Sequence, residues 1–291
     1  MSPCYKIDIK EKSYEQHFNI EIGQYTDELF APDQCDEKIL GFDSSVHLND
    51  NLWHPHFPRM SSRCLSNGVL RGDLEKHLGR GLNKILPNMK FNLFIQFKRP
   101  EYLSGHRSGQ WEHWKRSYYR FTLTPHQQEL LEKLAVVSKG RAAVVYASPA
   151  FNTLDELMEK KRNKEIIDSS NIISAEKLSG HTKCTYAEAG NISMGHSEPV
   201  EIVSPPLSKI LAQRSENKGQ PFTQHIKKSA DIIVKAIREN KTIENSVKLA
   251  KSALGNEDVV ELPVEHSSWS DALLTIRAFS IVSDISLVSV S

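Results

Sequence analysis

Apolar residues recur at helical spacing in several stretches of this chain. Over 12–29, Tyr14 and Phe18 fall on one face of a helix, and Ser13 followed by Gln16 three residues later is typical of a capping box. The pattern predicts further helices over 71–87, 124–140, 152–170, 225–241, 242–255 and 271–288, the last with a trailing strand.

Other stretches have the pattern of strands. Residues 91–103 begin with an apolar run, and 142–151 form a continuous apolar run of the kind found in buried sheets. Two further strands are expected over 39–48, bent around Gly41, and over 118–123. Because strands and helices alternate along the chain, the pattern predicts an α/β fold.

The character of the sequence changes near residue 200. A Pro-Pro pair and a polar linker precede the C-terminal helices, whereas residues 49–70 are rich in Asn, His, Pro and Ser. We therefore expect a core over 1–200 that contains an irregular excursion at 49–88. A mainly helical extension over 201–291 is expected to follow it.

Composition narrows the class of protein. Of the 291 residues, 39% are hydrophobic and 25% are charged, which is typical of a folded globular protein. The net charge of +1 neither supports nor excludes nucleic-acid binding, so any basic surface is expected to be local. The four cysteines lack zinc-ligand spacing and the N-terminus is too charged for a signal peptide, which favours the cytoplasm. No apolar run reaches the roughly 18 residues that a membrane span needs, so no membrane association is expected.

Candidate chemistry begins at the end of the strand over 91–97. Gln96 and Lys98 alternate there, so their side chains are expected on one face of the strand. Asp43 ends the earlier expected strand, and Glu15 or Glu21 on the first helix can add a second carboxylate. Carboxylates hold a hard divalent cation, and a nearby lysine neutralises the charge that develops during phosphodiester cleavage. These residues together predict a metal-dependent nuclease site.

The order helix-Glu, Gly-Phe-Asp and Gln-Phe-Lys resembles the restriction-endonuclease-like superfamily of PD-(D/E)xK nucleases. It is most similar to the Mrr-type branch, in which Gln replaces the second acid. The resemblance covers roughly residues 12–100. It implies that Asp43 binds the metal, that Gln96 stands in the second acidic position, that Lys98 is the catalytic lysine, and that Glu15 is the first-helix glutamate.

The resemblance further implies a mixed β-sheet flanked by helices and a cleavage reaction on DNA that uses Mg²⁺ or Mn²⁺. A bacterial role in restriction or antiviral defence is expected from it, beside a partner protein of the defence system. Such nucleases commonly form homodimers, and the apolar C-terminal tail is a candidate interface.

Three alternatives stay open at this point. Gln96 adds no negative charge, so the fold can belong to a weak or inactive subunit that binds nucleic acid or acts as a scaffold. Asp43 can be an ordinary turn residue. Gln96 and Lys98 can also lie on a solvated sheet face of an unrelated α/β protein.

A basic and aromatic block over 107–120 is the expected DNA-contacting segment. Arg107, Lys115 and Arg116 within it, together with Arg99, are candidates for phosphate contacts. The tryptophans and tyrosines of the block are expected to cover the edge of the core. The histidines His54, His56, His181 and His196 fit no zinc pattern and are expected to be loop or hydrogen-bonding residues.

Overall fold

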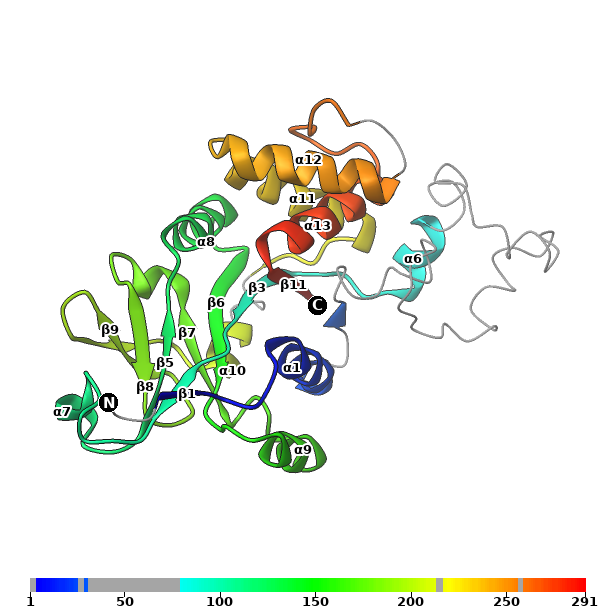
Figure 1. Ribbon diagram of the computed structural model, residues 1–291. Helices are drawn as coiled ribbons and strands as arrows, with labels where there is room; N and C mark the ends of the chain where they lie inside the picture. The colour runs from blue at the N-terminus through cyan, green and yellow to red at the C-terminus, as the bar shows by residue number, and fades with distance from the viewer. Residues whose placement is uncertain (1–3, 26–28, 31–78, 213–216, 256–258) are drawn as a thin grey trace. The chain divides into compact units, whose positions relative to one another are not determined.

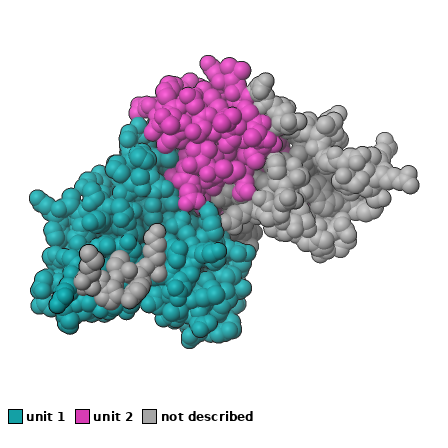
Figure 2. All heavy atoms as spheres, viewed as in Figure 1, with its two compact units in different colours: residues 1–27, 93–213 teal, residues 28–92, 214–291 magenta. Residues whose placement is uncertain are grey.

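The computed structural model describes residues 4–25, 29–30, 79–212, 217–255 and 259–291. The chain has an α/β fold with mixed and antiparallel sheets, flanking helices and a helical C-terminal region (Figure 1), which confirms the predicted class and the predicted helical C-terminus. It divides into two compact units, residues 1–27 with 93–213 and residues 28–92 with 214–291 (Figure 2). The boundary expected at residue 200 stays a prediction.

Unit 1 contains a six-stranded antiparallel sheet of order β1-β4-β5-β8-β9-β10. Its strands are β1 (Cys4–Lys6), β4 (Glu101–Leu103), β5 (Tyr118–Thr122), β8 (Lys183–Tyr186), β9 (Ile192–His196) and β10 (Val200–Val203). On one face Arg120 lies between Glu101 and Thr185, and on the other Tyr119 lies between Tyr102 and Tyr186. At these positions the alternation places charged and hydroxyl side chains on one face and tyrosine side chains on the other.

A second set of strands in unit 1 has the order β3-β6-β7. It consists of β3 (Phe91–Phe97), whose last five residues belong to unit 1, β6 (Ala142–Pro149) and β7 (Ser170–Ser174). β6 and β7 pair antiparallel, and the backbone N–H of Lys98 donates to the carbonyl of Ala147 at 2.9 Å. All seven residues of β3 are buried, so this strand lies in the core.

Unit 1 contains several helices, and in some of them the residues at the helix ends explain where the helix begins or ends. They are α1 (Glu11–Tyr25), α7 (Trp111–Trp114), α8 (Pro125–Ser138), α9 (Leu154–Asn163), the 3-10 turn η2 (Ala175–Leu178) and α10 (Leu207–Ala212). In α8, Pro125 occupies the first turn and Lys139 ends the helix in the left-handed region, with φ of 48°. α1 begins at Glu11, so Ser13 lies inside the helix and the capping box predicted there is wrong. A capping box does form in α9, between Thr153 and Glu156.

Unit 2 is mainly helical. It contains β2 (Leu29–Phe30), α6 (Gly79–Ile85), α11 (Phe222–Ile237), α12 (Lys241–Gly255), α13 (Trp269–Ser283) and β11 (Ile285–Val290). α13 packs against both α11 and α12, and β11 pairs antiparallel with β2. The apolar C-terminal tail comprises the end of α13 and β11. All six residues of β11 are buried, whereas Ile281 near the end of α13 is 55% exposed. The dimer interface expected on this tail stays a prediction.

Among the helices that the structure describes, none combines the length and the apolar character that crossing a bilayer requires.

Candidate active site

β3 presents Gln96 and Lys98 to one side and Phe97 to the other. Gln96 and Lys98 both contact α8, whereas the ring of Phe97 packs against Tyr14 and Phe18 of α1, with centroids 5.6 and 5.3 Å apart. The period of two in a strand produces this division. The amide and the ammonium that the sequence placed together therefore face the same helix.

A single side chain from α8, Gln127, bridges the pair. Lys98 Nζ donates to Gln127 Oε1 at 2.6 Å, and Gln127 Nε2 donates to Gln96 Oε1 at 2.6 Å. Gln96 Nε2 in turn donates to the carbonyl of Phe97 at 3.2 Å. Gln96 is buried and Lys98 is half-buried, so the chain of contacts runs from the core to the edge of the site.

Below the ammonium lies an aromatic ring that is itself fixed by α8. Lys98 Nζ is 5.6 Å from the centroid of the Tyr146 ring, which is within reach of a cation–π interaction. The Tyr146 hydroxyl donates to Gln128 Oε1 at 2.8 Å, and Gln128 Nε2 donates to Glu132 and to the carbonyl of Ala175. Burial raises the pKa of Tyr146 well above its ordinary value, so the phenol remains a donor. We refer to Gln96, Lys98, Gln127 and Tyr146 as the Lys98 cluster.

Neither of the predicted acids Asp43 and Glu15 is seen in the Lys98 cluster among the described residues. Asp43 and most of the excursion at 49–88 lie outside the described residues. Glu15 is buried on α1, the helix that packs on the Phe97 side of β3, and its carboxylate accepts from Lys12 Nζ at 2.8 Å. The structure therefore puts the helix of Glu15 on the opposite side of β3 from Lys98.

Glu21, the alternative to Glu15, is a structural clamp. Its two carboxylate oxygens accept the backbone N–H groups of Ile166 and Ile167 at 2.8 and 2.9 Å. Glu21 is buried, and the two charge-assisted bonds satisfy donors that would otherwise be unpaired in the core.

The Lys98 cluster supplies one candidate metal ligand, the neutral side-chain oxygen of Gln96. In the described ranges no three His, Cys, Asp or Glu residues gather in a way that could hold a metal ion. Magnesium prefers carboxylate and other oxygen ligands in octahedral geometry. These residues alone therefore do not fit a magnesium site.

The basic candidates for DNA contact fall into two kinds. Arg99 is half-buried, donates through its guanidinium to the carbonyl of Ile7, and through its backbone N–H to Glu11 Oε2, so it holds the end of β3. Arg107, Lys115 and Arg116 are exposed around α7. Arg116 also pairs with Glu188 at 2.9 Å.

The aromatic residues of the same block lie on the sheet. Trp114 Nε1 donates to Thr185 Oγ1 at 3.0 Å, Tyr118 is fully buried, and Tyr119 stacks on Tyr186 with centroids 5.3 Å apart. This placement agrees with the expectation that they cover the core. His196 Nε2 contacts Thr185 Oγ1 at 2.8 Å, so it is a hydrogen-bonding histidine, as expected.

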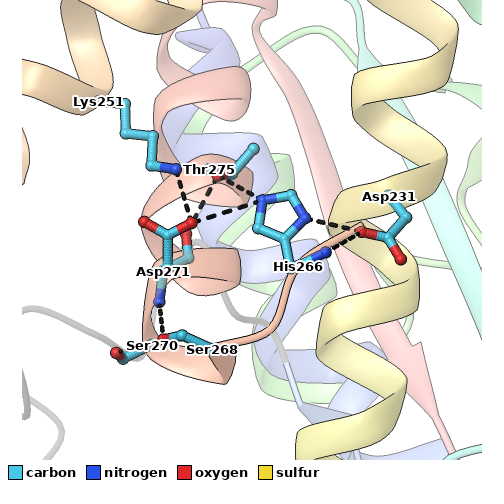
Figure 3. A network of polar contacts seen from close by, with 7 residues as sticks. All are labelled: Asp231, Lys251, His266, Ser268, Ser270, Asp271 and Thr275. Carbon is cyan, nitrogen blue, oxygen red and sulfur yellow. Dashed lines mark hydrogen bonds and ion pairs between the residues drawn. The ribbon is translucent and has the colours of Figure 1, made fainter. Parts of the chain in front are cut away.

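A second polar cluster lies in unit 2 (Figure 3). Asp231 Oδ1 accepts from the backbone N–H of His266 at 2.8 Å and contacts its Nδ1 at 2.7 Å, while His266 Nε2 lies 3.0 Å from Thr275 Oγ1. Lys251 Nζ donates to Asp271 Oδ2 at 2.8 Å beside them. We refer to these five residues as the His266 cluster.

The His266 cluster has the order carboxylate, imidazole, hydroxyl that hydrolases use, but a substrate cannot reach it. The side chain of His266 is 0% exposed and Thr275 is fully buried. The Thr275 hydroxyl also contacts the carbonyl of Asp271 at 3.1 Å, one turn earlier in α13. Nucleophilic catalysis needs an accessible hydroxyl, so we assign this cluster a structural role.

Sequence reasoning did not single out Gln127, Gln128 or Tyr146. One signal was present: Gln128 lies one helical turn before Leu131, an apolar and buried residue of α8. A glutamine on an apolar stripe needs partners in the core, which it finds here in Tyr146 and Ala175.

Comparisons with protein-family models, with curated proteins and with solved structures give no match to this chain. The resemblance to PD-(D/E)xK nucleases therefore stays a prediction.

Proposed function

We propose that this chain is a metal-dependent DNA endonuclease with a restriction-endonuclease-like core. The observation that carries the proposal is the Lys98 cluster. A half-buried lysine and a buried amide oxygen share one side of a core strand and are joined by one bridging side chain. A merely solvated sheet face would not bury Gln96 to 1% exposure.

The roles follow from the chemistry of each group. Lys98 would neutralise charge that develops on the phosphate, and Gln96 Oε1 would offer one neutral ligand. Asp43 would supply the carboxylate that the described residues lack. Glu15 would be the second carboxylate of the metal site. Because its helix packs on the other side of β3, its carboxylate would have to reach the metal past the end of that strand. The bound Mg²⁺ or Mn²⁺ would polarise the phosphate and acidify the attacking water.

DNA would be held by the exposed residues Arg107, Lys115 and Arg116 around α7. Arg99 contributes indirectly in this proposal, because its guanidinium is bound to Ile7. We further propose a cytoplasmic role in bacterial restriction or antiviral defence, with a homodimer or a partner protein of the defence system.

Plasmid cleavage tests the proposal. Purified wild type, Asp43→Ala, Glu15→Ala and Lys98→Ala are incubated with supercoiled DNA in Mg²⁺, in Mn²⁺ and in EDTA. Lys183→Ala is the matched control, because Lys183 is an exposed strand lysine outside the Lys98 cluster. The proposal expects DNA cleavage that depends on the ion. Its rate should fall by about a hundredfold or more in Asp43→Ala and Lys98→Ala and should be unchanged in Lys183→Ala. Equal cutting by all variants would overturn it.

A second candidate is a catalytically inactive nuclease-fold subunit that binds nucleic acid or scaffolds a defence complex. The observation in its favour is that Gln96 carries no charge and its oxygen already accepts a hydrogen bond from Gln127. Fluorescence anisotropy with labelled DNA separates the two candidates. Binding by wild type and Asp43→Ala alike, with no cleavage in either ion, would favour the second.

A further inference from the structure

We propose that Gln127 is a positioning residue of the Lys98 cluster, which sets the separation of the Lys98 ammonium and the Gln96 oxygen. The inference rests on the proposed nuclease function. It assigns Gln127 no contact with substrate, and its effect on the reaction is through the two groups that it holds.

The carboxamide is suited to this bridge because it carries an acceptor and a donor side by side. Its oxygen accepts from Lys98 Nζ at 2.6 Å, and its nitrogen donates to Gln96 Oε1 at 2.6 Å. A glutamate would keep the first contact and lose the second. An alanine would lose both.

Gln127 is itself held on a rigid element. It is the third residue of α8, whose start is fixed by Pro125 and by the bond from the Gln128 N–H to the Thr124 carbonyl at 2.9 Å. The next residue, Gln128, anchors the helix through the carbonyl of Ala175 and through Tyr146, the ring beneath Lys98. Gln127 thus contacts the Lys98 ammonium, and the adjacent Gln128 contacts the Tyr146 ring near it. Sites built on helices and strands are held more accurately than sites on loops.

The contact with Gln127 restricts where the ammonium can lie. Ordering a lysine side chain costs up to about 2 kcal/mol of conformational entropy. The bond from Lys98 Nζ to Gln127 Oε1, with the Tyr146 ring 5.6 Å away, offsets part of this cost. A fixed ammonium is what a reaction needs, since a displacement of about 1 Å lowers rates by as much as a hundredfold.

The experiment compares Gln127→Ala and Gln127→Glu with Gln224→Ala. Gln224 is a matched control, because it is exposed and is also the third residue of a helix, α11, that a proline precedes. Single-turnover cleavage is measured over a range of DNA concentrations, with DNA affinity and the melting temperature. We expect Gln127→Ala to lower the cleavage rate about tenfold or more, with DNA affinity and melting temperature near those of wild type. Gln224→Ala should match wild type throughout.

The dependence of the rate on DNA concentration gives a readout that a structural role would not move. Loss of positioning should lower the rate at saturating DNA while the half-saturating DNA concentration stays that of wild type. Gln127→Glu keeps the acceptor for Lys98 but loses the donor to Gln96, so its rate should fall between those of wild type and Gln127→Ala. The NMR resonances of the Lys98 ammonium and the Gln96 side-chain amide are compared in the same variants, which requires no cleavage.

The outcomes separate the two proposals. Cleavage by Gln127→Ala at the wild-type rate, or Lys98 and Gln96 resonances unchanged in both variants, would overturn the positioning role while leaving the nuclease intact. A wild-type chain that cuts in neither ion would overturn the proposed function, and the positioning role of Gln127 would fall with it. A slower variant with shifted Lys98 and Gln96 resonances supports both.

Discussion

The Lys98 cluster of unit 1 and the His266 cluster of unit 2 are built from similar contacts but differ in access. His266 is enclosed, and beside it the side chain of Lys251, 4% exposed, pairs with the carboxylate of Asp271. Lys98 is half-buried and is held by a neutral amide over an aromatic ring. The order of functional groups in the His266 cluster looks catalytic but its histidine is enclosed, whereas Lys98 is only half-buried. Access to the reacting group, rather than its list of neighbours, distinguishes a candidate site from a structural one.

The largest expected effect comes from breaking the ion pair of the His266 cluster. Lys251→Met leaves the carboxylate of Asp271 without its cation in a buried setting, so we expect the free energy of unfolding to fall by about 3–5 kcal/mol. Urea denaturation measures it. Lys241→Met on the same helix is the control, because Lys241 is 75% exposed and its pair with Glu244 should contribute less than about 1 kcal/mol.

The double variant Lys251→Met, Asp271→Leu sharpens this prediction. Replacing both charges with apolar groups removes the unpaired carboxylate, so much of the lost stability should return. Ser268 caps α13 through the backbone N–H of Asp271, which the double variant leaves in place. No recovery would indicate that the pair matters through packing and not through charge.

Asp231→Ala is expected to cost somewhat less, about 2–3 kcal/mol, because it leaves the backbone N–H of His266 and its ring without their acceptor. Asp231→Asn keeps an acceptor oxygen and should cost less than the alanine variant. Thermal and urea unfolding of both variants measure the difference. Equal losses would show that the charge of Asp231 matters more than its hydrogen bonds.

Acid should destabilise the fold through its buried histidines. Burial, followed by the nearby His113, lowers the pKa of His196 to about 4, and burial also lowers the pKa of His266 although Asp231 opposes it. The unfolded chain takes up these protons near pH 6.5, before the folded chain does. Stability is therefore complete above about pH 6.5 and falls as the pH drops below it. For His196 the loss continues to about pH 4 and is at most about 1.4 kcal/mol per pH unit. Unfolding curves at several pH values test this, and His196→Gln should flatten the slope.

The smallest expected effect on stability is that of Lys98→Ala. Lys98 is half-buried and its bond to Gln127 is to a neutral amide, so we expect a loss below about 1 kcal/mol even where DNA cleavage is abolished. Measuring unfolding and cleavage on one preparation checks both. A loss as large as that of Lys251→Met would mean that the Lys98 cluster is structural as well.

The long periodic elements could be predicted from the sequence. α8, β6 and α11 appear close to their expected bounds, and α13 is followed by a strand as expected. Their apolar stripes match the side of each element that is buried. The strand over 91–103 is interrupted after Phe97, where the chain continues to Pro100, which has no N–H for a sheet ladder.

The strands β8, β9 and β10 were not predicted. They are four or five residues long. β8 and β9 contain Thr, Ser, Gly and His, so no apolar run marks them, and β10, Val-Glu-Ile-Val, is too short for its pattern to predict a strand. Pairing with neighbours far along the chain makes them strands, for example Phe121 of β5 with Cys184 of β8. Such tertiary context overrides local propensity.

Part of the candidate site could be predicted from the sequence and part could not. Gln96 and Lys98 share a side because strand period fixes it, which one segment of sequence is enough to show. Gln127 is 29 residues beyond Lys98, and its contact depends on how α8 packs over β3. Likewise, the sequence around Glu21 does not indicate that its carboxylate accepts the backbone N–H of Ile166 rather than binding a metal.

The Glu21 clamp also bears on how unit 1 folds. Its two bonds join α1 to residues about 145 positions further along the chain. Closing so long a loop is entropically costly and contributes to slow folding. α1 can form its turns early, but it docks only after the segment around β7 has taken its place. Until then the buried carboxylate and the two amides must remain hydrated, so the anchoring of this helix is expected to be a late, rate-limiting event in refolding.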